Sequence, residues 1–280
     1  KAAACGGTTL TIDFAWQQHP YTSVMEVIDV KRAEMDSEMA IDYALHAIVS
    51  GNISIEEIQS VPKAIEYGIP TIKMFTCLAG TPEKPGFMVD NGRIWAVFQQ
   101  ITRNNGMALL HVEDECIVQQ SIAQLYHEGR TEGKYIAEAR PSLCEEAALR
   151  RMLVLSKWTN TALYFVHMSS KEGVAAIAEA RSEELPVYGE VLAHYMNFTA
   201  DDYSRSLIYH NYPPLKYKED QAALWDAANN GTLTTIASDD FTVPLAQKLR
   251  GDRIDNMTGG NNGVEMRLPI MFSEGVSKGR

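Results

Sequence analysis

Four polar side chains end or interrupt apolar runs of the sequence, and their types suit one kind of chemistry. They are Lys73 in ProThrIleLysMetPhe, His111 after MetAlaLeuLeu, His167 after LeuTyrPheVal and Asp239 after ThrThrIleAlaSer. Taken singly, each has a structural interpretation, such as a hydrogen-bonded histidine, a helix N-cap or a lysine that reaches the protein surface. Together, two imidazoles, a carboxylate and an amine form a nitrogen and oxygen ligand set for divalent metal ions.

Lys73 is the unusual member of this set. A buried ammonium group is costly and repels divalent cations. We therefore expect the Lys73 side chain to be neutralised, paired or chemically modified.

The elements that must position these residues alternate along the chain. Short apolar, β-branched runs predict strands at 8–14, 41–49, 70–75, 107–112, 162–166, 186–191 and 232–237. Stretches of helical period predict helices that include 55–67, 92–101, 145–158, 172–181 and 217–228. Apolar strands separated by amphipathic helices are typical of a parallel sheet covered on its faces.

The predicted fold is α/β, a (β/α)8 TIM-type barrel. A doubly wound sheet normally shows a Gly-rich phosphate turn after its first strand, whereas GlyGlyThrThr at 6–9 precedes a strand. Barrel enzymes place reactive groups at the C-terminal ends of their strands, which would bring the four polar residues to one face. Seven strands are found where eight are needed, so we expect the first strand to lie upstream of Lys1. Residues 1–280 are then one incomplete barrel domain.

Composition narrows the function classes. The 280 residues include 25 Lys and Arg against 36 Asp and Glu, a formal net charge of −11, which argues against binding of nucleic acid. No apolar run is long enough to span a membrane, and no signal-peptide pattern opens the chain. The four cysteines form no CxxC pair, which favours reduced structural thiols and a cytoplasmic protein, with Cys77 as a small apolar filler.

The motifs resemble those of the dihydropyrimidinase and D-hydantoinase family of the amidohydrolase superfamily. GlyIleProThrIleLysMetPhe at 68–75 resembles the segment of that family that contains a carboxylated lysine. HisValGluAsp at 111–114 resembles HisAlaGluAsn, and residues 2–14 are similar to the strand after the metal-binding HxH. The further matches are TyrPheValHisMetSerSer at 164–170, TyrProProLeuLys at 212–216, SerAspAsp at 238–240 and GlyAsnAsnGlyValGluMetArg at 260–267.

The resemblance implies a metal-dependent hydrolase that opens the ring of a cyclic amide, ureide or imide. Two divalent ions, usually zinc, would be bridged by carboxylated Lys73, with His111 and His167 on one ion and Asp239 on the other. A hydroxide shared by the ions would attack the ring carbonyl, because bound cations lower the pKa of water. Asp239 would act first as general base and then as general acid.

The resemblance also implies residues that contact the substrate, and one of them departs from the family pattern. Family members bind the substrate amide through backbone groups near positions matching Tyr212 and Asn262. Where the family has a Tyr that supports the oxyanion, five residues after the bridging lysine, this chain has Leu78. Loss of one such donor costs roughly 10²–10³ in turnover, so either another group replaces it or the substrate class differs.

A second departure concerns the ligand set. The HxH pair of the family is absent, and His19 lies too late in the chain to replace it. We expect the whole protein to supply this strand and a flanking β-sandwich, and this chain alone to bind metal poorly.

Two alternative functions stay open. A collapsin-response-mediator-like scaffold has the same fold with its ligands replaced, although the retention of all four polar residues speaks against it. A sibling enzyme, such as an allantoinase or dihydroorotase, is the other. The family also implies a small-molecule substrate and a homotetramer.

Overall fold

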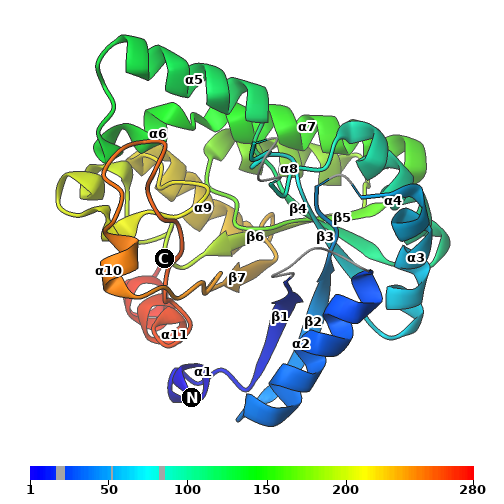
Figure 1. The fold of residues 1–280 in the computed structure, drawn as a ribbon. Helices are drawn as coiled ribbons and strands as arrows, with labels where there is room; N and C mark the ends of the chain where they lie inside the picture. The colour runs from blue at the N-terminus through cyan, green and yellow to red at the C-terminus, as the bar shows by residue number, and fades with distance from the viewer. Residues whose placement is uncertain (17–22, 52, 82–85) are drawn as a thin grey trace.

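The fold is a parallel sheet wrapped by helices (Figure 1). The computed structural model of the chain describes residues 1–16, 23–51, 53–81 and 86–280, so His19 lies outside the described residues. The seven strands are β1 (Leu10–Ala15), β2 (Asp42–Ile48), β3 (Thr71–Phe75), β4 (Met107–His111), β5 (Ala162–Phe165), β6 (Val187–Leu192) and β7 (Thr235–Ala237). They confirm all seven predicted strands. Each strand pairs in parallel with the next one along the chain.

Helices connect successive strands and cover the outside of the sheet (Figure 1). The longer ones are α2 (Val24–Glu38), α3 (Ile55–Glu66), α4 (Asn91–Arg103), α5 (Glu115–His127), α7 (Ser142–Thr159), α8 (Lys171–Ser182) and α9 (Lys218–Asn230). Short helical segments are α1 (Ala2–Cys5), α6 (Ile136–Ala139), α10 (Leu245–Lys248), α11 (Arg267–Met271), a π-helical turn Phe272–Val276 and the 3₁₀ turns Gly133–Tyr135, Ala200–Ser204 and Leu207–Tyr209.

Side-chain caps explain where several helices begin. Ser54 and Glu57 form a reciprocal capping box at the start of α3, with each side chain bonded to the other residue's backbone N–H. Asp114 accepts a bond of 3.1 Å from the backbone N–H of Ile117 and so begins α5. Within the described residues, no helix combines the length and apolar character that crossing a bilayer requires.

The core lies between the sheet and its helices. Ile72 and Met74 of β3 and Leu110 of β4 are fully buried, as are Phe98 of α4 and Phe165 of β5. This is the pattern expected of parallel strands that are covered on their faces.

The sheet curls, but its two outer strands do not pair with each other. A side chain links the segments at these two edges. The guanidinium of Arg267 donates to the backbone oxygen of Ile236 in β7 over 2.9 Å and to Oγ1 of Thr8, just before β1, over 3.3 Å. The described residues therefore form a curled half-barrel of seven parallel strands.

Truncation of Phe98 tests the core. Phe98 is 0% exposed, so Phe98→Ala should lower the free energy of unfolding by about 3–5 kcal/mol. Trp158 of α7 is 84% exposed, so Trp158→Ala should change the free energy of unfolding by no more than about 0.5 kcal/mol. Urea unfolding followed by circular dichroism measures both, and equal losses would contradict the packing described.

Candidate metal centre and active site

The four predicted ligands lie on or just after four different strands, three of them at C-terminal ends and Lys73 within its strand. Lys73 is the third residue of β3 and His111 the last of β4, while His167 and Asp239 each follow their strand by two residues. His167 and Asp239 both have positive φ, 44° and 45°, in the left-handed region that side chains rarely adopt. Such backbone strain gathers at functional sites. The left-handed backbone conformation changes the direction of the His167 and Asp239 side chains just after their strands end.

His111 and His167 lie against each other and are buried. Their ring centroids are 4.5 Å apart, with 73° between the ring planes. Burial lowers the pKa of both imidazoles, that of His167 well below its ordinary value. Both rings are therefore neutral at physiological pH, the protonation state in which imidazole binds metal ions.

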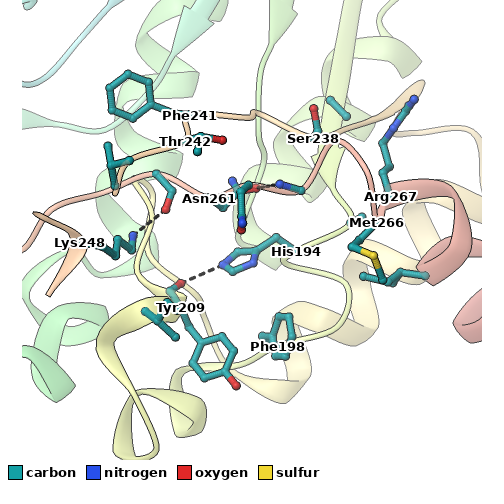
Figure 2. Close-up of a pocket in the computed structure, with 18 of the residues that line it drawn as sticks. His194, Phe198, Tyr209, Ser238, Phe241, Thr242, Lys248, Asn261, Met266 and Arg267 are labelled. Atoms are coloured by element: carbon teal, nitrogen blue, oxygen red, sulfur yellow. Dashed lines mark hydrogen bonds between the residues drawn. The ribbon is translucent and has the colours of Figure 1, made fainter. Parts of the chain in front are cut away.

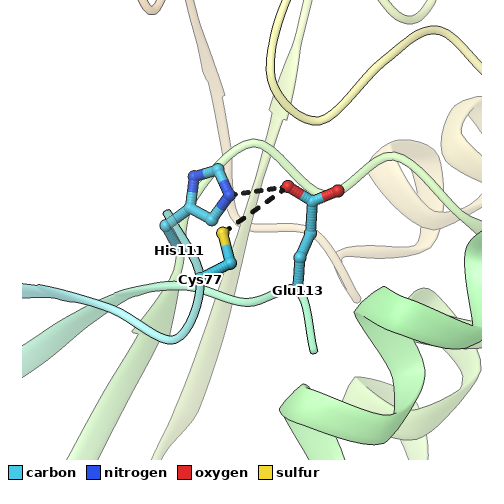
Figure 3. Close-up of side chains that lie close together, drawn as sticks. All are labelled: Cys77, His111 and Glu113. Atoms are coloured by element: carbon cyan, nitrogen blue, oxygen red, sulfur yellow. Dashed lines mark hydrogen bonds and ion pairs between the residues drawn. The ribbon is translucent and has the colours of Figure 1, made fainter. Parts of the chain in front are cut away.

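Glu113 fixes the tautomer of His111 (Figure 3). Burial raises the pKa of the Glu113 carboxyl, but the charge of Arg140 and the contact with His111 outweigh it and hold this pKa at about 2. Arg140 donates to Oε1 through Nε and to Oε2 through Nη2, both over 2.9 Å. An ionised carboxylate only accepts, so His111 carries its proton on Nε2, 2.8 Å from Oε2. The lone pair of Nδ1 is left to bind a metal ion.

Cys77 completes this cluster without making it an ion site. The ligand atoms of Cys77, His111 and Glu113 all lie within 4.8 Å of one another (Figure 3). Both oxygens of Glu113 are already bonded to Arg140, and burial raises the pKa of the Cys77 thiol, which keeps it protonated. The cluster therefore orients His111, and Cys77 is buried as its predicted role of small filler requires.

Lys73 lies where an ammonium group is poorly supported. Its side chain is 3% exposed, and its Nζ lies 4.8 Å from the ring centre of Phe75 and 5.5 Å from that of Phe14. Burial lowers the pKa of Lys73 to about 8, although the charges of Asp239 and Glu190 oppose the shift. In the described part of the chain no hydrogen bond to Nζ is found. The amine is thus partly neutral near physiological pH.

Glu190 is a further, partly buried acid beside these residues. It lies on β6, where it accepts from the backbone N–H of His167 over 3.1 Å and from the hydroxyl of Tyr164 over 2.8 Å. Burial raises the pKa of Glu190 to about 7. Glu190, Lys73 and Asp239 line one cavity of about 340 Å³ on the inner side of the sheet.

The predicted substrate-binding residues lie around this centre in different ways. Tyr212 packs under the guanidinium of Arg140, 4.7 Å from ring centre to Cζ, and donates its hydroxyl hydrogen to the backbone oxygen of Met257 over 3.1 Å. Leu78 follows Cys77 with a positive φ of 66°. Its side chain brings no hydroxyl.

Asn262 lines a second cavity, which has a volume of about 410 Å³. Figure 2 shows this cavity with Asn261, the neighbour of Asn262 in the sequence. This cavity shares Ala237 and Ser238 with the cavity that holds Lys73 and Asp239. Asn262 itself is exposed.

Sequence reasoning missed three residues that contact the predicted ligands or their partners. Arg140 pairs with Glu113, Glu190 accepts from His167, and Asn211 donates to Asp239. Arg140 and Asn211 belong to connecting segments, where no hydrophobic period singles out a position. Glu190 interrupts the sixth predicted strand as Lys73 interrupts the third. A charged residue within an apolar strand is therefore a sequence signal that could have identified Glu190.

Comparison with known proteins agrees with this geometry. No family model matches the chain. The chain is 32% identical over 278 residues to a D-hydantoinase of Streptomyces coelicolor, across 97% of this chain and 58% of that protein. A crystal structure of a D-hydantoinase superposes with a TM-score of 0.91 at 30% identity, over 100% of this chain and 61% of that one.

The chain is thus similar to D-hydantoinases over nearly its whole length. The dihydropyrimidinase structure from Brevibacillus agri also matches, with a TM-score of 0.91 and 29% identity over 99% of this chain and 60% of that one. The predicted family resemblance is thereby confirmed. The chain spans about three fifths of the length of these relatives.

The ion pair behind His111 can be tested by its stability. Glu113→Gln leaves the buried Arg140 without its counter-charge, so the free energy of unfolding should fall by about 3–5 kcal/mol. Glu146 makes an exposed pair with Arg150, and Glu146→Gln should cost less than about 1 kcal/mol. Guanidinium unfolding at neutral pH compares the two; a loss at Glu113 no larger than at Glu146 would refute the buried pair.

Proposed function

We propose that the whole protein is a metal-dependent hydrolase that opens the ring of a cyclic amide, ureide or imide of the dihydropyrimidine or hydantoin type. One observation carries this proposal. His111, His167 and Asp239 end or follow three strands of one curled parallel sheet, and Lys73 lies within a fourth, in a chain homologous to D-hydantoinases. The ring-opened product would be an N-carbamoyl amino acid or a similar acid.

The four residues suit a pair of divalent metal ions, for which zinc is the first candidate. His111 presents Nδ1, and His167 is a neutral imidazole with no ring hydrogen bond to another described residue. Bound ions would supply a Lewis acid and lower the pKa of water in the site. The ligand types, two nitrogens and a carboxylate, match the preferences of zinc.

Carboxylation of Lys73 would complete this set. Only a neutral amine attacks carbon dioxide, and burial keeps part of Lys73 neutral. A nitrogen–carbon bond forms, one proton leaves, and a cationic side chain becomes an anion that can bridge two cations. The change removes the conflict between a buried ammonium and divalent metal ions.

Asp239 would handle the proton of the reaction. Its carboxylate follows β7 at the mouth of the sheet and lines the same cavity as Lys73. There it would accept a proton from the attacking water and return it to the leaving ring nitrogen. Backbone groups near Tyr212 and Asn262 would hold the amide of the substrate, while Leu78 leaves the oxyanion without the usual phenol.

The finer architecture belongs to the same proposal. Residues 1–280 would be the catalytic domain of a (β/α)8 barrel, closed by an eighth strand between β1 and β7, with a β-sandwich beside it. The unpaired outer edges of β1 and β7 support this arrangement. We also propose a cytoplasmic homotetramer.

The decisive experiment uses the whole protein and its Lys73→Ala variant. Ring opening of dihydrouracil, hydantoin and succinimide is followed by the loss of ring absorbance, with bound metal measured by mass spectrometry. Lys73→Ala should lose all detectable ring opening and at least half of the bound metal, because the bridging ligand is gone. Lys63→Ala, on the exposed last turn of α3, should change neither.

The outcomes separate the candidates. Wild-type protein without stoichiometric metal and without activity would support the scaffold alternative. Stoichiometric metal without activity on this panel would favour a sibling enzyme. Full activity of Lys73→Ala would refute the proposed bridge. So would a native mass of the intact wild-type protein equal to that of the unmodified chain, without the added mass of one carbon dioxide.

A further inference from the structure

Asn211 contacts the carboxylate of Asp239 from a separate loop. It is 4% exposed and lies between the 3₁₀ turn Leu207–Tyr209 and the start of the ProPro turn. Its Nδ2 donates to Oδ2 of Asp239 over 3.1 Å. Among the described residues this is the one side-chain hydrogen bond that the carboxylate receives.

The orientation of the Asn211 amide follows from a second bond. The backbone N–H of Gly260 donates to Oδ1 of Asn211 over 3.1 Å. Because an N–H needs an acceptor, the oxygen of the amide must face Gly260 and its nitrogen must face Asp239. The side chain therefore has a fixed direction, with its donor aimed at the carboxylate.

Lys248 anchors the two loops that meet at Asn211. Its Nζ donates to the backbone oxygens of His210, Thr258 and Gly260, the last two over 2.9 and 2.6 Å. His210 directly precedes Asn211, and Gly260 bonds to it. The ammonium of Lys248 is bonded to three backbone carbonyl oxygens. The group of these loops that contacts the Asp239 carboxylate is therefore the neutral amide of Asn211.

Asp239 needs such support. It has left-handed backbone geometry and follows a strand of three residues, and its side chain is only partly buried. A second asparagine, Asn261, holds the main chain there by donating from Nδ2 to the backbone oxygen of Asp239 over 3.1 Å. Asn211 thus acts on the carboxylate and Asn261 on the backbone.

We propose that Asn211 is a positioning residue, which binds Oδ2 of Asp239 and leaves Oδ1 free for the reacting centre. The proposal rests on the function proposed above, because that function gives Asp239 its role. A neutral donor suits this place: it holds an ionised carboxylate in one orientation without adding a positive charge that would compete with metal ions.

The test uses two variants of the whole protein. Asn211→Asp keeps the acceptor for Gly260 and replaces only the donor, so that an oxygen faces Asp239. Asn211→Leu has a similar volume and no donor. In both, kcat for ring opening should fall about ten- to a hundredfold while KM stays within about threefold, since the lost bond orients the reacting group.

A second readout does not depend on activity. The protein is loaded with Co²⁺, whose visible absorption reports the geometry of its ligands. Both variants should change the intensity of these bands with the midpoint of thermal unfolding kept close to that of wild type. Asn104→Asp is the matched control, because Asn104 bonds a main-chain oxygen at the end of α4, and it should change neither kinetics nor spectrum.

Each result decides. A folded variant with wild-type kcat and an unaltered Co²⁺ spectrum would overturn the role of Asn211. If Asn211→Asp fails to fold, the same measurements on Asn211→Leu test that role. If wild-type protein opens none of the rings, the proposed function fails by itself. The Co²⁺ spectra still show whether Asn211 holds Asp239.

Discussion

The centre of the molecule is governed by one constraint, the cost of keeping the charge of Lys73 out of water. The amine lies on the third of seven parallel strands, between two phenyl rings, with Asp239 and Glu190 as the acids whose charge reaches it. A buried ammonium is tolerated only when anions or a change of protonation state compensate for lost hydration. His111 and His167 are buried as well, and they avoid the cost of a buried charge because their imidazoles are neutral. Asp239 and Glu190 place their carboxyl groups near the amine of Lys73.

Precision at the site comes from buried carboxyl groups that each make several hydrogen bonds. Glu113 links Arg140 to His111, and so fixes a tautomer on β4 from a residue that precedes α7. Glu145 does similar work after β5, where it accepts from the backbone N–H groups and hydroxyls of Ser169 and Ser170. Glu113 thus binds a side chain at the end of β4, and Glu145 binds the turn that follows β5, which holds both strand ends in place.

Much of this arrangement is predictable from the sequence because the physical signals are local. Apolar β-branched runs predicted all seven strands, and polar residues that interrupt or end such runs are the four proposed ligands. The helix α2 was missed because few of its fifteen residues face the core, so that its apolar spacing is irregular. Arg140 and Asn211 were missed for another reason. Their partners lie 27 and 28 residues away, and no local pattern contains a contact made between loops.

The bridge made by Arg267 has a consequence for how the chain assembles. It joins positions separated by 259 residues, nearly the whole length of the chain, whereas each strand pairs with its immediate neighbour. Contacts of such separation are costly in loop entropy and form after local ones. During synthesis the amine and the two imidazoles can therefore come together on β3, β4 and β5 before the carboxylate of Asp239 has left the ribosome. Arg267, whose side chain spans the open side of the half-barrel, is likewise translated only after all seven strands.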